Sequence, residues 1–131
     1  MSKPLHIKAS DATRKHKNEH DDYEYYKRDL VPKGFAEQCA VSIYEIPPGK
    51  SAYPYHYHMK NEECFYIISG EGILKTPLGD QLVSAEIFCS FQQMKKVLTS
   101  LLILRKQNCL FIWTLIHITI LMWRFIQIQK K

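Results

Sequence analysis

The pattern of apolar and polar residues changes twice along the chain. Residues 1–34 are polar, residues 35–86 alternate apolar and polar positions in short runs, and residues 87–131 are apolar in blocks with neither a helical nor a strand period. Alternation with a period of two is typical of strands with one buried face. We therefore predict a polar N-terminal arm (1–34), a β-rich segment (35–86) and a C-terminal tail of different character (87–131).

The middle segment has the pattern of short strands joined by turns. Its apolar runs, AVSIYEI, CFYIIS and QLVSA, are separated by PPGK, SGEG and PLGDQ. Gly70 and Gly79 stand where a tight turn needs a positive φ, which glycine adopts without steric cost. Short strands with frequent turn signals favour an antiparallel sandwich or barrel, and no helix is required. We expect SGEG and PLGDQ to close hairpins.

The N-terminal segment combines many charged residues with Tyr23, Tyr25 and Tyr26. A segment of this composition buries little apolar surface by itself. We expect an arm that packs on the rest of the chain through its tyrosines or is partly disordered, with its histidines facing solvent.

Two histidines and a glutamate in the middle segment have a spacing that suits a metal site. His56 and His58 lie two residues apart, so on a strand they project from the same face. We expect Glu63 to begin the next strand, on the face it shares with Phe65. A carboxylate among apolar side chains is costly without a cation or a partner. Two imidazoles and one carboxylate can together bind a divalent metal.

This spacing resembles the first sequence motif of the cupin family. That motif is glycine, five residues, H-x-H, three or four residues, glutamate, six residues and glycine. Gly49, His56, His58, Glu63 and Gly70 take these places, with one additional residue between the first glycine and the first histidine. The motif favours Glu63 over Glu62 because only Glu63 leaves six residues before Gly70, and Glu62 is then expected to point the other way.

The resemblance covers residues 36–86 and implies an all-β fold, the cupin double-stranded β-helix or jelly-roll barrel. It also implies that His56, His58 and Glu63 bind a divalent metal ion (Mn, Fe, Ni or Zn) near the mouth of the barrel, together with a small-molecule ligand or substrate. Two functions stay open. Such a cupin is either a metal-dependent enzyme, for example an oxygenase or isomerase, or a non-catalytic ligand-binding protein.

The tail lacks the second cupin motif and with it the fourth metal ligand. Residues 87–131 contain no glycine, proline, aspartate or glutamate, and His117 lacks the flanking residues of that motif. We therefore expect an incomplete barrel with an aberrant hydrophobic C-terminal tail. A membrane tail and an unfamiliar soluble fold are alternatives. However, the apolar run Leu110–Trp123 has 14 residues, against about 20 in a membrane-spanning helix.

A change of reading frame near Glu86 would explain the composition of the tail. If one base is missing there, each original codon is divided between two codons of the present frame. Met94 followed by Lys95 then gives glutamate, and Trp113 followed by Thr114 gives aspartate, because methionine and tryptophan have single codons. With choices at degenerate positions, the restored tail begins GDFLFFPANEKGAHKLTN, which approximates the second motif. A chain read out of frame would be impaired or have no function.

Charge and cysteine content change this picture little. The net charge is +5, but the basic residues are scattered without the aromatic or glycine pattern of a nucleic-acid reader, so we expect no nucleic-acid partner. The four cysteines form no C-x-x-C pair and follow no secretion signal, which predicts a cytoplasmic protein. We expect Cys39 and Cys64 to be buried packing residues. We expect no membrane association, and a homodimer for the intact barrel.

Sequencing this locus in close relatives tests the reading-frame hypothesis. We expect one additional base near the codon of Glu86, followed by codons that give the restored tail. An undisturbed locus in relatives whose products all end as this chain does would contradict the hypothesis.

Overall fold

The chain is described by a computed structural model in residues 3–56, 61–91, 100–102 and 110–116, with side chains in the first two ranges. The described part is almost entirely β-structure, as predicted, and its one helix is a short 3₁₀ helix, Ala9–Asp11. The strands are β1 (Arg14–His20), β2 (Tyr23–Asp29), β3 (Ala40–Ile46), β4 (Glu63–Ile67), β5 (Glu71–Thr76), β6 (Gly79–Ser84), β7 (Phe88–Phe91), β8 (Ser100–Leu102) and β9 (Leu110–Ile116).

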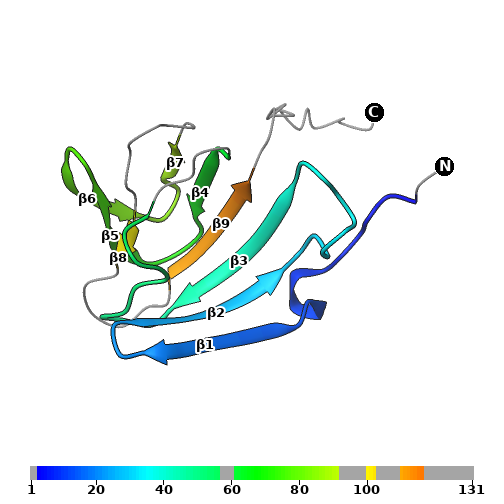
Figure 1. Cartoon of the computed structure of the whole chain (residues 1–131), viewed down its shortest axis with the longest axis horizontal. Helices are drawn as coiled ribbons and strands as arrows, with labels where there is room; N and C mark the ends of the chain where they lie inside the picture. The colour runs from blue at the N-terminus through cyan, green and yellow to red at the C-terminus, as the bar shows by residue number, and fades with distance from the viewer. Residues whose placement is uncertain (1–2, 57–60, 92–99, 103–109, 117–131) are drawn as a thin grey trace, which may run out of the picture.

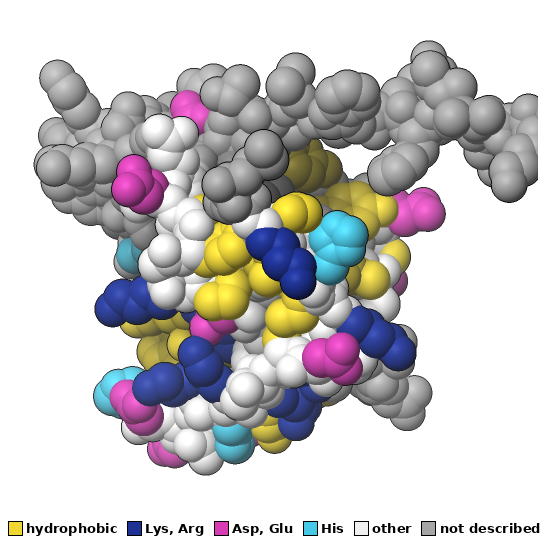
Figure 2. Space-filling model, turned by 90° about the vertical axis from the view of Figure 1, so that its right-hand side faces the viewer, with side chains coloured by type: hydrophobic (Ala, Val, Ile, Leu, Met, Phe, Trp, Pro, Cys, Tyr) yellow, Lys and Arg dark blue, Asp and Glu magenta, His cyan; other side chains and the backbone are white. Residues whose placement is uncertain are grey.

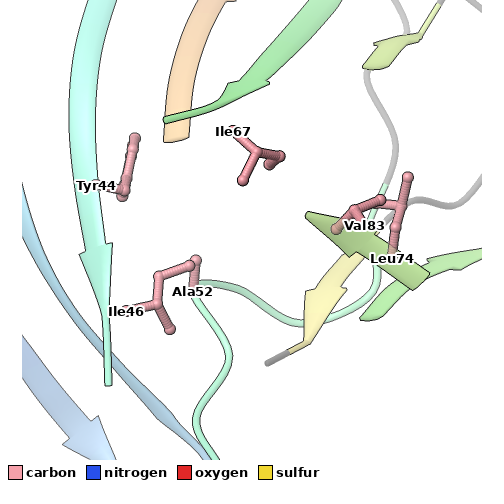
Figure 3. Close-up of a cluster of buried hydrophobic side chains, with 6 residues drawn as sticks. All are labelled: Tyr44, Ile46, Ala52, Ile67, Leu74 and Val83. Carbon is pink, nitrogen blue, oxygen red and sulfur yellow. The ribbon is translucent and has the colours of Figure 1, made fainter. Parts of the chain in front are cut away.

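The strands form two antiparallel sheets around a shared apolar core (Figure 1). The larger sheet has the order β1-β2-β3-β9-β4-β7 and the smaller sheet has the order β6-β5-β8. Ile46 and Ile67 of the larger sheet are 0% and 1% exposed, and they share one core cluster with Leu74 and Val83 of the smaller sheet (Figure 3). The alternation seen in the sequence corresponds to one buried and one outer face on β5, whereas β3 is buried on both faces from Ser42 to Ile46.

Residues 14–29 form a hairpin of the larger sheet, where we predicted an arm. β1 pairs with β2, and β2 pairs with β3. The residues of β1 are exposed and those of β2 are half-buried, so this hairpin adds strands with little aliphatic burial. Tyr25 packs against the core, which agrees with the expected role of the tyrosines. His6, His16 and His20 are exposed, as predicted.

The tail predicted to lie outside the barrel contributes strands to both sheets. β7, β8 and β9 all begin after residue 86, and β9 lies between β3 and β4 in the larger sheet. The hydrogen bonds of a sheet are made by the main chain, so an extended segment rich in apolar and aromatic residues can occupy this position whatever motif it lacks. Residues 110–116, which the membrane-tail alternative included, are part of this sheet. The described residues include no helix long and apolar enough to cross a membrane.

The two predicted hairpin turns have different outcomes. PLGDQ joins β5 to β6, which pair with each other, and Gly79 has a φ of 114°. That prediction is confirmed. SGEG contains Gly70, with a φ of 86°, but it connects β4 of the larger sheet to β5 of the smaller one. The turn is present there, but the hairpin prediction is wrong because the chain changes sheet at this point.

The cysteine predictions also differ in outcome. Cys64 is buried, with 7% of its surface exposed, and its thiol lies 3.6 Å from the hydroxyl of Ser90 on β7. Cys39 is only partly buried because it precedes β3 and lies outside the sheet.

The turn between β6 and β7 places Glu86 in a conformation that favours glycine. The Ile87 N–H donates to the Ser84 carbonyl at 3.2 Å, which closes a four-residue turn with Glu86 at its third position. The Glu86 N–H donates to the Ile67 carbonyl at 2.8 Å and ties this turn to β4. Glu86 has a φ of 72° and is the one non-glycine residue with positive φ in the described part of the chain. A side chain in this left-handed region is strained.

Replacing Glu86 with glycine should therefore stabilise the protein. We expect Glu86→Gly to raise the free energy of unfolding by about 1 kcal/mol, since relief of the left-handed strain exceeds the entropic cost of glycine. Glu71→Gly is a matched control in β5, where φ is not positive, and should destabilise by about 0.5–1 kcal/mol. Urea unfolding of the two variants measures both effects, and equal destabilisation would contradict the turn geometry.

The burial of Ile67 predicts a larger change in the free energy of unfolding than the turn substitution does. Ile67 is 1% exposed, so Ile67→Ala should leave a cavity and lower the free energy of unfolding by about 2–5 kcal/mol. Leu78 is 94% exposed at the β5–β6 turn, and Leu78→Ala should change stability by no more than about 0.5 kcal/mol. Denaturant melts of the two variants compare these effects, and similar losses in both would show that Ile67 is not part of a packed core.

Candidate metal site

Glu63 is the buried carboxylate of the candidate site. It is the first residue of β4, and its position pairs with Phe91 on β7 and Ile116 on β9. Glu63 is 7% exposed and shares its face of β4 with the core residue Ile67, whereas Glu62 is exposed. Of the two glutamates, therefore, only Glu63 is turned to the interior, and its role as a metal ligand stays a prediction.

His56 lies in the connection between β3 and β4, and its neighbours select one tautomer. Its Nδ1 is 2.8 Å from the carbonyl oxygen of Pro54. A carbonyl can only accept, so Nδ1 carries the proton and donates, and the lone pair of the neutral ring is on Nε2. A histidine that binds metal through one nitrogen commonly donates from the other in this way.

His58, the third predicted ligand, lies outside the described residues. Among the residues that are described, no three His, Cys, Asp or Glu side chains form a group able to hold a metal. The structure thus places two of the three predicted ligands, and the complete ligand set remains a prediction.

Three tyrosines that we did not assign to the site lie beside it. Tyr25 on β2, Tyr44 on β3 and Tyr53 in the following loop form what we call the tyrosine cluster. Their ring centroids are 5.4 Å apart for Tyr25 and Tyr44, 5.0 Å for Tyr25 and Tyr53, and 6.0 Å for Tyr44 and Tyr53. The Tyr53 ring also contacts the His56 ring edge-on at 5.9 Å. The cluster therefore connects the core to the candidate metal ligands.

The phenols of the cluster are kept neutral. Burial raises the pKa of Tyr25, Tyr44 and Tyr53 well above the ordinary value of a tyrosine. The charge of Glu63 adds to this rise for Tyr44 and Tyr53, so the carboxylate lies within electrostatic reach of both phenols. Neutral phenols can donate hydrogen bonds throughout the physiological pH range. The alternation in AVSIYEI is a signal that could have identified Tyr44 as inward-facing. It could not have shown that Tyr44 meets Tyr25 and Tyr53, because these residues come from other segments of the chain.

Asp29 forms a charged group with Lys15 and Lys27 beside the tyrosine cluster, on the same face of the sheet. Asp29 on β2 accepts hydrogen bonds from Lys15 at 2.7 Å and from the Ser42 hydroxyl at 2.8 Å, and its carboxylate is 2.9 Å from the Lys27 ammonium. Lys27 pairs with Tyr44 across the strands, and its ammonium lies 5.5 Å from the centre of the Tyr44 ring. Lys15 and Lys27 therefore share Asp29 on this face of the sheet.

The pKa of Asp29 follows from these contacts. Burial acts to raise it, but the hydrogen bonds from Lys15, Lys27 and Ser42 outweigh burial and hold the pKa well below its usual range. Asp29 is therefore ionised in the folded protein even in mildly acidic solution.

On the outer face of the sheet, basic residues are also paired. Glu45 accepts from Arg14 at 2.7 Å and from Arg28, and the Arg14 guanidinium lies 3.5 Å from the centre of the Tyr26 ring. On the face drawn in Figure 2, basic and acidic side chains are interspersed around hydrophobic ones. The described residues visible on this face form no patch of a single charge sign. The expectation that nucleic acid is not a partner stays a prediction.

Comparisons with known proteins agree with this architecture. No family model matches the sequence, and no curated protein does. Among solved structures, the chain is similar to a predicted oxalate decarboxylase from Thermotoga maritima, with a TM-score of 0.75 and 19% identity over 87% of this chain and 99% of that one. It is similar to a sugar phosphate isomerase from a cupin superfamily, from Silicibacter pomeroyi, with a TM-score of 0.74 and 15% identity over 87% and 76% of the two chains.

The cupin domain of Cnp3 from Schizosaccharomyces pombe is a further similar structure, with a TM-score of 0.62 and 12% identity over 79% of this chain and 67% of that one. The chain therefore has the cupin fold, and the all-β jelly-roll barrel implied by the motif spacing is confirmed. At these sequence identities the similarity establishes the fold alone.

The contacts of Asp29 predict a specific pH dependence. Because its pKa is lower in the folded than in the unfolded state, the stabilisation is complete above the unfolded value of about 4 and is lost as the pH falls toward the folded value. We expect Asp29→Asn to lower the free energy of unfolding by about 2 kcal/mol at pH 7.

The difference from the wild type should shrink below about pH 4, where the unfolded carboxyl is protonated. Urea unfolding at pH 7, 5 and 3 measures this trend. Asp80→Asn, at an exposed position of β6, is the control and should have no comparable effect. A penalty for Asp29→Asn that is the same at all three pH values would rule out the ionic explanation.

Proposed function

We propose that the chain is a small metal-binding cupin-domain protein in which His56, His58 and Glu63 bind a divalent metal ion (Mn, Fe, Ni or Zn). The single observation that carries this proposal is the burial of Glu63 on the inner face of β4. A carboxylate in such a place is suited to a cation. The His56 tautomer, with Nδ1 bound to the Pro54 carbonyl, supports the same assignment because it leaves the lone pair on Nε2.

The ligand set suggests what the centre does. Two imidazoles and one carboxylate leave coordination positions for a small molecule, and a bound divalent metal supplies a Lewis acid for one of its oxygen atoms. Pro54 orients the His56 ring, and the β4 register holds Glu63 toward the interior. The similar structures named for a sugar phosphate isomerase and an oxalate decarboxylase support a small-molecule ligand or substrate for this chain also.

We further propose that the reading frame changes at Glu86, so that this chain lacks the fourth ligand of an intact cupin and is impaired. The positive φ of Glu86 supports this proposal, because the restored sequence has glycine at that position. The turn geometry is independent of the codon argument. Cytoplasmic location, and a homodimer for the intact barrel, stay predictions.

Metal analysis tests the binding proposal. The wild-type chain and a frame-restored protein are each loaded with Zn²⁺ or Mn²⁺, dialysed and measured for metal content. We expect one metal per frame-restored chain and weaker binding by the chain with three ligands. His56→Ala, His58→Ala and Glu63→Gln should each weaken metal binding by at least about tenfold.

His6→Ala is the matched control, since His6 is exposed in the N-terminal segment, and it should retain full metal binding. Absence of metal from the frame-restored protein, or equal retention by His56→Ala and His6→Ala, would reject the metal site. In that case a non-catalytic cupin that binds its ligand without metal becomes the better description.

A further inference from the structure

A groove opens between the two sheets where their edge strands lie side by side. Among the described strands, β6 is at the edge of the smaller sheet and β7 is at the edge of the larger one. Residues of β5, β6 and β7 line a cavity of about 540 Å³ between them. Small-molecule sites in proteins are mostly apolar cavities of about 300–1,000 Å³. The groove therefore has the size of a small-molecule site.

The lining of the groove is apolar both at its base and at its rim. Leu74 and Val83, each 3% exposed, form the base and belong to the core cluster. On the rim, Leu82 of β6 is 73% exposed and Phe88 of β7 is 53% exposed. A molecule held in the groove would cover these two side chains, and their removal from water favours binding.

The lining of the groove carries no charge among the residues that the structure describes. Of these lining residues, Cys89 alone is titratable, and burial raises the pKa of its thiol, which is therefore neutral at physiological pH. A charged molecule would lose water in this cavity without gaining a partner of opposite charge. The lining therefore matches an uncharged molecule.

Gln81 supplies a polar contact at the open side of the groove. It pairs with Leu74 and lies two residues before Val83, so it is on the inward face of β6, and yet it is exposed. The Thr76 hydroxyl, by contrast, is used within the β5–β6 turn, where it donates to the Gly79 carbonyl at 2.8 Å. The Gln81 amide has both donors and an acceptor, so it can hydrogen-bond with one polar group of a ligand.

The extent of the groove favours a small molecule over a second copy of the chain. Twelve of the described residues line it. A stable protein–protein interface uses roughly 20–30 residues from each partner and buries about 800 Å² on each. The groove is too small for such an interface, whereas a cavity of this volume can enclose a small molecule.

We propose that this groove is a second binding site of the protein, and that it takes an uncharged, largely apolar small molecule with one polar group facing Gln81. Neither His56 nor Glu63 lines the groove, so the site does not depend on the proposed metal centre. Residues 87–91 follow the proposed change of reading frame, so the groove belongs to this chain as it stands.

Fluorescence titration of the full chain with N-phenylnaphthylamine tests the proposal, because the fluorescence of this uncharged probe increases in an apolar site. Anilinonaphthalene sulfonate is the matched anionic probe, with the same ring system and one sulfonate group. We expect the wild-type chain to bind the uncharged probe more tightly than the anionic one. Tighter binding of the anionic probe, or no binding of the uncharged one, would overturn the proposal.

Two pairs of variants locate the bound probe. Phe88→Ala should weaken binding of the uncharged probe by about tenfold. Phe35→Ala, at a position that is 51% exposed and outside the strands, should have no such effect. Gln81→Lys adds a positive charge to the lining and should raise the affinity for the anionic probe, relative to the uncharged one, by about threefold. Gln38→Lys, at an exposed position away from the groove, is its control.

Equal losses in Phe88→Ala and Phe35→Ala, at unchanged thermal midpoints, would place the probe elsewhere and overturn the proposal. If Phe88→Ala does not fold, the two lysine variants decide, and an equal preference between the probes in Gln81→Lys and Gln38→Lys rejects the groove. Sedimentation of the same proteins examines the other occupant. A wild-type dimer that Phe88→Ala dissociates and Phe35→Ala does not would assign the groove to a second copy of the chain and reject the small molecule.

Discussion

A carboxylate on the inner face of an apolar sheet is the constraint on which the candidate site depends. Glu63 occupies the first position of β4, and pairing with β7 and β9 turns it toward the side that buries Ile67. A shift of one residue in this register would bring Glu62 inward and turn the apolar set of β4 outward. The cost of exposing Ile67 therefore holds Glu63 in place. The phenols of Tyr44 and Tyr53 lie within electrostatic reach of Glu63. Binding of a cation at this position is part of the proposed function.

The β1–β2 hairpin shows how a polar segment joins a barrel. Each of its faces has one carboxylate shared by two cations. Asp29 lies between Lys15 and Lys27 on the face that bears Tyr44, and Glu45 of β3 lies between Arg14 and Arg28 on the other face. Shared carboxylates of this kind form a network, which contributes more than isolated surface pairs do. Tyr25 adds the aromatic contact to the core.

The turn at Glu86 and the strand β9 bear in opposite directions on the proposed change of reading frame. The turn is defined by its main-chain hydrogen bonds to Ser84 and Ile67, and it places a glutamate where glycine is favoured. β9 is likewise placed by main-chain pairing, between β3 and β4. The backbone of the barrel is thus compatible with the tail. The misfit appears at Glu86, where the side chain affects the allowed φ, and this is the residue at which the frame is proposed to change.

The sequence by itself determined the local features of this protein. Alternation identified strands within residues 35–86, glycine marked the positive φ at Gly70 and Gly79, and the motif spacing pointed to the cupin barrel and to Glu63 rather than Glu62 as the inward carboxylate. These features depend on residues close together in the chain. Only the tertiary structure decided that residues 14–29 form a hairpin, that SGEG crosses between sheets, that β9 enters the larger sheet, and that three tyrosines meet beside His56. The hairpin is held in the sheet by the pairing of β2 with β3, and the other outcomes depend on pairing between distant segments. Backbone hydrogen bonds and long-range ion pairs carry no periodic signal in the sequence.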